Sequence, residues 1–184
     1  MINRNEALVL IKKYINNREL IRISFSVEEI LKDIAKRSNK DKELWAMTGL
    51  LHNIDYEYTS YEPEKRGYVS SQLLEGLLPD EALNAIKANN YMYTGHTPAT
   101  ALDKALIASA AVSEFIISVV SSTDSKKLNE INFDLVQFKY NDNSFIDKKI
   151  KNKINICVDF GIDLKSFLNL SINSLKRISN NLLL

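Results

Sequence analysis

Apolar residues recur at spacings of three and four along most of the chain, which is the pattern of amphipathic helices. Signals for strands and tight turns are sparse, because the 184 residues include only five Gly and three Pro. The pattern therefore predicts an all-α protein. The expected helices span about residues 7–15, 20–37, 42–53, 67–77, 79–90, 101–120, 126–139, 144–160 and 163–178.

Two of these helices have features of their own. The segment 42–53 is apolar nearly all round, which is typical of a helix at the buried centre of a bundle. Thr100 and Asp103 fit a capping box at the start of the long helix 101–120, because a hydroxyl and a carboxylate at this spacing bond the free N–H groups of a helix start. Asp163 is expected to begin the last helix in a similar way.

Composition and charge narrow the class of protein. Hydrophobic residues are 45% and charged residues 26%, the ordinary range for a folded domain, and no linker divides residues 1–184, so we expect a single domain. The formal charge of +1 excludes a global field that would attract nucleic acid. The lysine-rich stretch 148–153 is the best local candidate, but Asp147 and Asp159 flank it, so we expect a solvated helix face and no nucleic-acid partner.

The sequence also indicates a compartment. The single Cys157 cannot form an intramolecular disulfide, and the first seven residues carry charge where a signal peptide would be apolar. The longest apolar run, 105–120, is interrupted by Glu114 and is shorter than the roughly 18 to 20 residues of a membrane span. We therefore expect a cytoplasmic protein that does not enter a membrane.

The segment from Leu44 to Glu57 carries a motif, Leu-Leu-His-Asn-Ile, that ends at Ile54. It resembles the central segment of the HD-domain (HDIG-type) phosphohydrolases, in which an apolar helix delivers an adjacent His-Asp pair to a divalent metal. The resemblance extends along the chain and is greatest to small predicted HD hydrolases of about this length. It implies one HD-like helical bundle, with the motif-bearing core at about 18–122 and a C-terminal helical extension at about 123–184.

The resemblance also implies where the metal ligands of such an enzyme would fall. A hydrolytic metal centre needs several His and carboxylate ligands and an open position, so that the pKa of the bound water falls and hydroxide is available near neutral pH. Among the implied ligand positions, only that of His52 still holds a side chain of this kind. The other implied positions hold Ile23 (or Ser24, if the register slips by one), Asn53, Arg66, Asn89 and Ala110. We therefore predict a pseudoenzyme whose metal site is degenerate, and we expect no cofactor.

Several of these residues also have ordinary structural interpretations. For His52, at the end of a buried helix, a hydrogen bond to the backbone is favoured over metal binding. Asn53 suits a helix end because it tolerates the left-handed conformation. Asp55 is either a polar remnant of the site or part of an Asx turn. Arg66 is either a solvated charge or, facing inward, a forked donor for phosphate or carboxylate, and His96 is expected at the surface.

Five tyrosines lie in two segments without helical period, 54–65 and 91–98. In the fold that the resemblance implies, both segments flank the mouth of the pocket. The side chains could stack on a ring of a ligand or pack the loops onto the bundle, and the sequence leaves both alternatives open. The tyrosines are Tyr56, Tyr58, Tyr61, Tyr91 and Tyr93.

Three hypotheses for function follow. In the first, the protein binds a small anionic or phosphate-containing ligand in the altered pocket, or binds a protein partner. The residues expected in that pocket are His52, Asn53, Asp55, Arg66 and Asn89. In the second, the protein is a phosphohydrolase of phosphomonoesters, phosphodiesters or nucleotides, and a divalent metal is held by His52, Asp55 and Glu57. In the third, it is a structural protein that forms a homo-oligomer through its last helix and the apolar tail 182–184.

Overall fold

Helices make up every regular element of residues 1–182, the part of the chain that this computed structural model describes. The prediction of an all-α protein is confirmed. The α-helices are α1 Arg4–Tyr14, α2 Arg18–Arg37, α3 Lys42–Leu51, α4 Tyr68–Leu73, α5 Asp80–Ala88, α6 Tyr91–Thr94, α7 Ala101–Ser121, α8 Phe133–Asn141, α9 Lys148–Asn155, α10 Leu164–Arg177 and α11 Ser179–Leu182. Short 3-10 turns lie at η1 Pro63–Lys65, η2 Leu128–Glu130 and η3 Ile156–Phe160.

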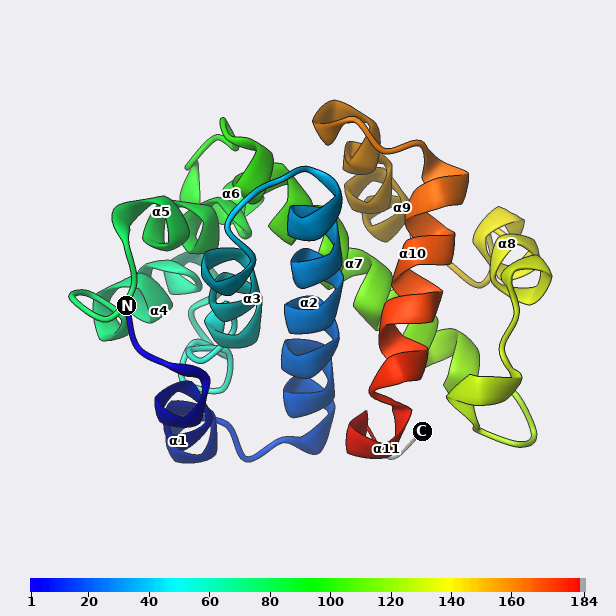
Figure 1. Cartoon of the computed structure of the whole chain (residues 1–184), viewed down its shortest axis with the longest axis horizontal. Helices are drawn as coiled ribbons and strands as arrows, with labels where there is room; N and C mark the ends of the chain where they lie inside the picture. Colours follow the sequence, from blue (N-terminus) through cyan, green and yellow to red (C-terminus); the bar gives the residue numbers. More distant parts are fainter. Residues whose placement is uncertain (183–184) are drawn as a thin grey trace.

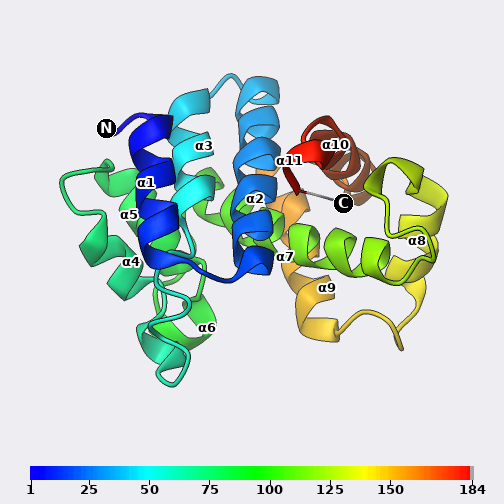
Figure 2. The same cartoon turned by 90° about the horizontal axis from the view of Figure 1, so that it is seen from below.

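The N-terminal helices pack side by side, with α3 between α1 and α2 (Figures 1 and 2). The helices α3 and α2 approach closely at Gly49 of α3, where an added Cβ would lie 2.8 Å from the carbonyl oxygen of Val27 on α2. As expected from its apolar pattern, α3 is buried from Trp45 to Leu51. This close pairing fixes the end of α3, which carries His52, against the middle of the bundle.

Helix α7 crosses behind α2 and contacts α2, α5, α9 and α10 (Figure 1). By length and composition it could span a membrane, since it has 21 residues where the interrupted run suggested a shorter segment. However, 78% of its most apolar window is buried inside the protein, which is the behaviour of a core helix. Its capping box is present as predicted, with Thr100 and Asp103 bonding each other's backbone N–H groups.

The last helices close the bundle on the other side of α2. Asp163 caps α10 as predicted. The apolar face of α10, including Phe167 and Leu175, is buried in the protein's own core, so it is not a free surface for oligomer formation. Leu182 is also fully buried, and the rest of the apolar tail, Leu183 and Leu184, lies outside the described residues.

The predicted helix boundaries were wrong in three regions, the first being the expected helix 67–77, which is shortened to α4 at Tyr68–Leu73. The segment 91–98 was expected to be a loop, but it begins with one helical turn, α6, which Gly95 ends at a φ of 68°. The expected helices 126–139 and 144–160 are each broken, because Asn132 and Asp147 accept backbone N–H bonds and start the shorter helices α8 and α9. Side-chain caps thus outweighed the apolar period in these polar segments.

Candidate functional site

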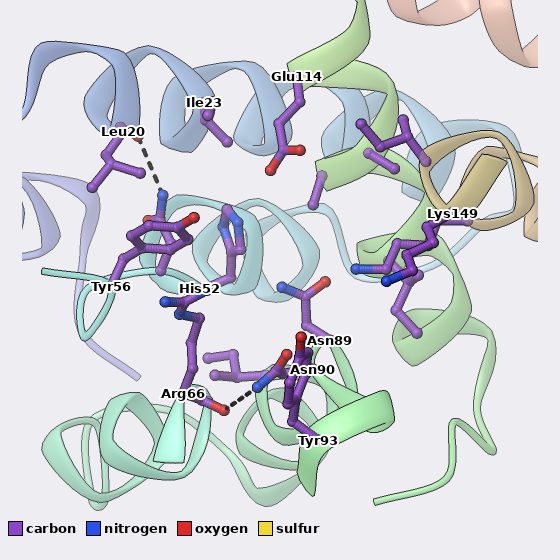
Figure 3. A pocket seen from close by; sticks show the side chains of 18 residues that line it. Leu20, Ile23, His52, Tyr56, Arg66, Asn89, Asn90, Tyr93, Glu114 and Lys149 are labelled. Carbon is purple, nitrogen blue, oxygen red and sulfur yellow. Dashed lines mark hydrogen bonds between the residues drawn. The ribbon is translucent and has the colours of Figure 1, made fainter. Parts of the chain in front are cut away.

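A cavity of about 250 Å³ lies where the end of α3 meets α2, α5, α7 and α9 (Figure 3). We call it the central pocket. Its polar lining consists of His52, Asn53, Tyr56, Arg66, Asn89, Asn90, Tyr93, Glu114, Lys149 and Lys153. Its apolar lining includes Ile23 and Ala110, two of the positions at which the resemblance implies metal ligands. The space between Ile23, His52 and Ala110 is therefore open and is not filled by side chains.

His52 combines a structural hydrogen bond with a free acceptor. Its Nδ1 lies 2.7 Å from the carbonyl oxygen of Gly49, which confirms the predicted backbone bond. A carbonyl oxygen only accepts, so Nδ1 carries the proton and Nε2 of the neutral ring is an acceptor. The residue is 5% exposed, and loss of solvent lowers its pKa to about 4. Nε2 has no hydrogen-bond partner among residues 1–182, and the ring lines the pocket (Figure 3).

The lowered pKa of His52 predicts how the free energy of unfolding depends on pH. His52 binds a proton near pH 6.5 when the chain is unfolded but only near pH 4 when folded, so the unfolded state binds more protons in between. The stability contributed by neutral His52 is complete above pH 6.5 and is lost as the pH falls toward 4. From pH 7.5 to pH 5 we expect its loss to cost about 2 kcal/mol of the free energy of unfolding.

Urea unfolding of the wild type and of His52→Gln at both pH values measures this cost, since other titrating groups contribute equally to both proteins. The wild type should lose about 2 kcal/mol more than the variant. An equal loss in the two proteins would mean that His52 titrates normally.

Asn53 lines the pocket, but its amide is used within the fold. Its Oδ1 accepts a bond of 2.7 Å from the Oγ of Ser24, and its Nδ2 donates to the carbonyl oxygen of Leu20 at 3.2 Å. Asn53 directly follows the C-cap of α3, as expected for a residue suited to a helix end, but its backbone is not left-handed. Asn53 ties the end of α3 to α2, and these two bonds commit one donor and one acceptor position of its amide to the fold.

Arg66 faces the central pocket from the segment that precedes α4 (Figure 3). Its guanidinium carbon lies 3.8 Å from the centre of the Tyr56 ring, and its Nε donates to the Oγ1 of Thr59 at 3.4 Å. The terminal nitrogens Nη1 and Nη2 have no hydrogen-bond or ion-pair partner in the described part of the chain. A guanidinium held by an aromatic face and directed into a cavity is suited to bind an oxyanion through two parallel N–H bonds.

Asp55 does not line the pocket, and both interpretations of it from the sequence were wrong. Its Oδ2 accepts bonds from the backbone N–H groups of Gly67 at 2.6 Å and Ser70 at 2.9 Å. The side chain is fully buried and caps the start of α4 from a distant part of the chain. Because Gly67 directly follows Arg66, Asp55 fixes the backbone from which Arg66 enters the pocket.

The alternative ligand set of His52, Asp55 and Glu57 does not converge. The carboxylate of Glu57 accepts bonds from the backbone N–H groups of Asn16 and Asn17, and these bonds lower its pKa. Among residues 1–182, no group of three or more His, Cys, Asp or Glu side chains is placed to hold a metal ion. The donor set of the central pocket, one imidazole and one carboxylate beside three cations, does not fit a divalent metal.

Three charged residues that line the pocket were not predicted from the sequence. Lys149 and Lys153 reach it from α9, where a solvated face was predicted, and Glu114 reaches it from α7. Glu114 is exposed toward the pocket, yet the surrounding protein raises its pKa, while the positive charges of Lys153 and Arg66 oppose that shift. Two features of the sequence could have identified them. Lys149 and Lys153 are four residues apart, which puts both on one face of a helix, and Glu114 is a lone carboxylate in an apolar run.

The remaining candidates divide between pocket and surface. Asn89 lines the pocket with no side-chain hydrogen bond among the described residues, whereas Asn90 donates to the carbonyl oxygens of Pro63 and Arg66. Tyr56 and Tyr93 line the pocket. The ring of Tyr58 instead packs edge-on against Tyr14, Tyr61 is 97% exposed, and neither they nor Tyr91 line it.

Comparison of the chain with family models, curated proteins and solved structures gave no match. The resemblance to HD-domain hydrolases therefore stays a prediction based on the residues around His52.

Proposed function

We propose that the protein binds a small anionic ligand directly in the central pocket and does not hydrolyse phosphate esters with a metal. The observation that carries the proposal is Arg66, whose terminal nitrogens are unpaired among the described residues and whose guanidinium faces the cavity. At the position where the resemblance implies a metal ligand, this chain has a permanent cation. A cation there repels a divalent metal and attracts the anion that a metal would otherwise bind.

The charge of the lining supports the same conclusion. Arg66, Lys149 and Lys153 supply three positive charges against the single carboxylate of Glu114, and His52 is neutral at physiological pH. The ammonium groups of Lys149 and Lys153 form no ion pair with the described residues. An anion in the cavity would meet several unpaired donors in a partly enclosed site, where electrostatic attraction is stronger than in water.

The test is the affinity for inorganic phosphate, measured by calorimetric titration of the wild type and of Arg66→Gln. We expect the variant to bind at least about tenfold more weakly, because a charge-assisted bidentate contact is lost. Arg37→Gln removes the same charge from an exposed position of α2 outside the pocket and should leave the affinity unchanged. Equal affinities in Arg66→Gln and the wild type would refute the proposal.

Lys149 and Lys153 give a second comparison on one helix. Replacing both by Gln should weaken phosphate binding, while Lys151→Gln on the same helix should not, because Lys151 does not line the pocket and its Nζ donates to Asn143. The proposal would be contradicted if the Lys151 variant lost as much affinity as the double variant.

A further inference from the structure

The central pocket contains hydrogen-bond acceptors as well as cations. Nε2 of His52 is an unprotonated acceptor in a side chain that is 95% buried, and it has no partner among the described residues. The carboxylate of Glu114 is a second acceptor and has no hydrogen bond within residues 1–182. In Figure 3 the ring of His52 lies between Arg66 and Glu114, and the amide of Asn89 lies between the guanidinium of Arg66 and the side chain of Lys149. A fully ionised oxyanion without a proton would place its own lone pairs against these acceptors.

We infer that the ligand is a small organic anion that carries its own hydroxyl groups, so that the cations hold its charge while His52 and Glu114 accept hydrogen bonds from its hydroxyls. This inference rests on the proposed function and specifies its ligand. Arg66 meets the charged group, the lysines of α9 add positive charge to the same cavity, and the two acceptors select the rest of the molecule. A site whose acceptors stay unpaired disfavours the analogue that lacks the matching donor, and the penalty is largest at Nε2 of the buried His52.

The size of the pocket limits the ligand. A cavity of about 250 Å³ is at the small end of ligand sites, so it suits a compound of a few carbon atoms. Inside the pocket the apolar side chains of Ile23, Ile86 and Ala110 offer room for a short carbon skeleton. A polyhydroxylated compound with one phosphate or carboxylate group meets all of these conditions.

Because of His52, the preference for a hydroxylated ligand does not depend on whether Glu114 is protonated. If Glu114 takes up a proton it becomes a donor to the anion, but the Nδ1 proton of His52 remains committed to Gly49. Nε2 therefore stays an acceptor at any pH well above 4. The charged groups that face this acceptor are Glu114 on α7, Lys149 and Lys153 on α9, and Arg66 before α4.

Two pairs of compounds test the inference on the wild-type protein, each pair differing only in hydroxyl groups. Glycerol 2-phosphate is compared with isopropyl phosphate, and glycerate with propionate, by calorimetric titration at pH 7.5. In whichever pair binds, the hydroxylated member should bind at least about tenfold more tightly. Equal affinity within the binding pair would overturn the inference while leaving the proposed function intact. Failure of all four compounds and of inorganic phosphate to bind would overturn both.

The role of each acceptor has a separate readout. The ¹⁵N resonance of Nε2 of His52 should shift when the hydroxylated compound binds, because the nitrogen then accepts a hydrogen bond, whereas the ring of His96 should not respond. Glu114→Gln replaces an acceptor by a group that also donates, so the preference for the hydroxylated member should fall severalfold. An unchanged His52 resonance, together with an unchanged preference in Glu114→Gln, would show that these acceptors do not select the ligand.

Discussion

Replacing Gly67 by Ala is expected to lower the free energy of unfolding by about 4 kcal/mol. Gly67 has a φ of 87°, in the left-handed region that an L-side chain adopts only with strain. An added Cβ would also lie 2.7 Å from the carbonyl oxygen of Ile86. That atom belongs to the backbone of α5, which cannot move away as the end of a flexible side chain could. The substitution therefore combines backbone strain with a clash between two buried segments.

Gly76→Ala is the matched control. Gly76 has a similar φ of 73°, but a Cβ there would meet nothing within 4 Å, so only the backbone strain of about 1.5 kcal/mol should be lost. Urea unfolding of both variants measures the difference. If the two substitutions cost the same, the close approach of α5 to Gly67 does not exist in solution.

Asp55→Ala is expected to cost about 3 kcal/mol, because it leaves two buried backbone N–H groups, those of Gly67 and Ser70, without an acceptor. One unfavourable feature of the wild type is removed at the same time, since Oδ1 of Asp55 is buried with no partner among the described residues. The loss of two acceptor contacts outweighs this gain. The variant should also bind phosphate more weakly, because Gly67 holds the backbone next to Arg66.

The control for Asp55 is Asn at the same position. The amide oxygen of Asn can take the place of Oδ2 and accept both N–H bonds, so Asp55→Asn should lose less than half as much stability as Asp55→Ala. Chemical unfolding of the two variants decides the matter. Should Ala be tolerated as well as Asn, the cap on α4 would contribute nothing.

Much of the fold was predictable because its helices carry strong local signals. The apolar period of residues 20–37 and the caps at Thr100 and Asp163 depend only on neighbouring residues, and the structure has a helix and two caps there. The C-terminal extension was harder, because Asn132 and Asp147 start new helices inside segments whose composition suggests continuous ones. A capping side chain and a solvated one look alike in sequence.

The pocket was predictable only in part. His52, Arg66 and Asn89 came from the resemblance, and all three line the central pocket. Asp55 was assigned to it wrongly, because its partners at Gly67 and Ser70 lie 12 and 15 residues away, and sequence alone does not indicate that contact.

Glu114 and the lysines of α9 were missed for a similar reason. They reach the pocket through the packing of α9 on α7, which is a tertiary contact without a local signature. The sequence shows that Lys149 and Lys153 share one face of a helix, but it does not show that this face lines the central pocket.

In the proposed function, the central pocket binds an anion directly where the resemblance implies a metal. A crystal grown with both Mn²⁺ and phosphate tests this proposal, because anomalous scattering distinguishes the metal from the anion. We expect phosphate in contact with the guanidinium of Arg66 and no manganese on His52. Manganese coordinated by His52 and at least two other protein groups would contradict it and would return the protein to the metal-dependent hydrolases.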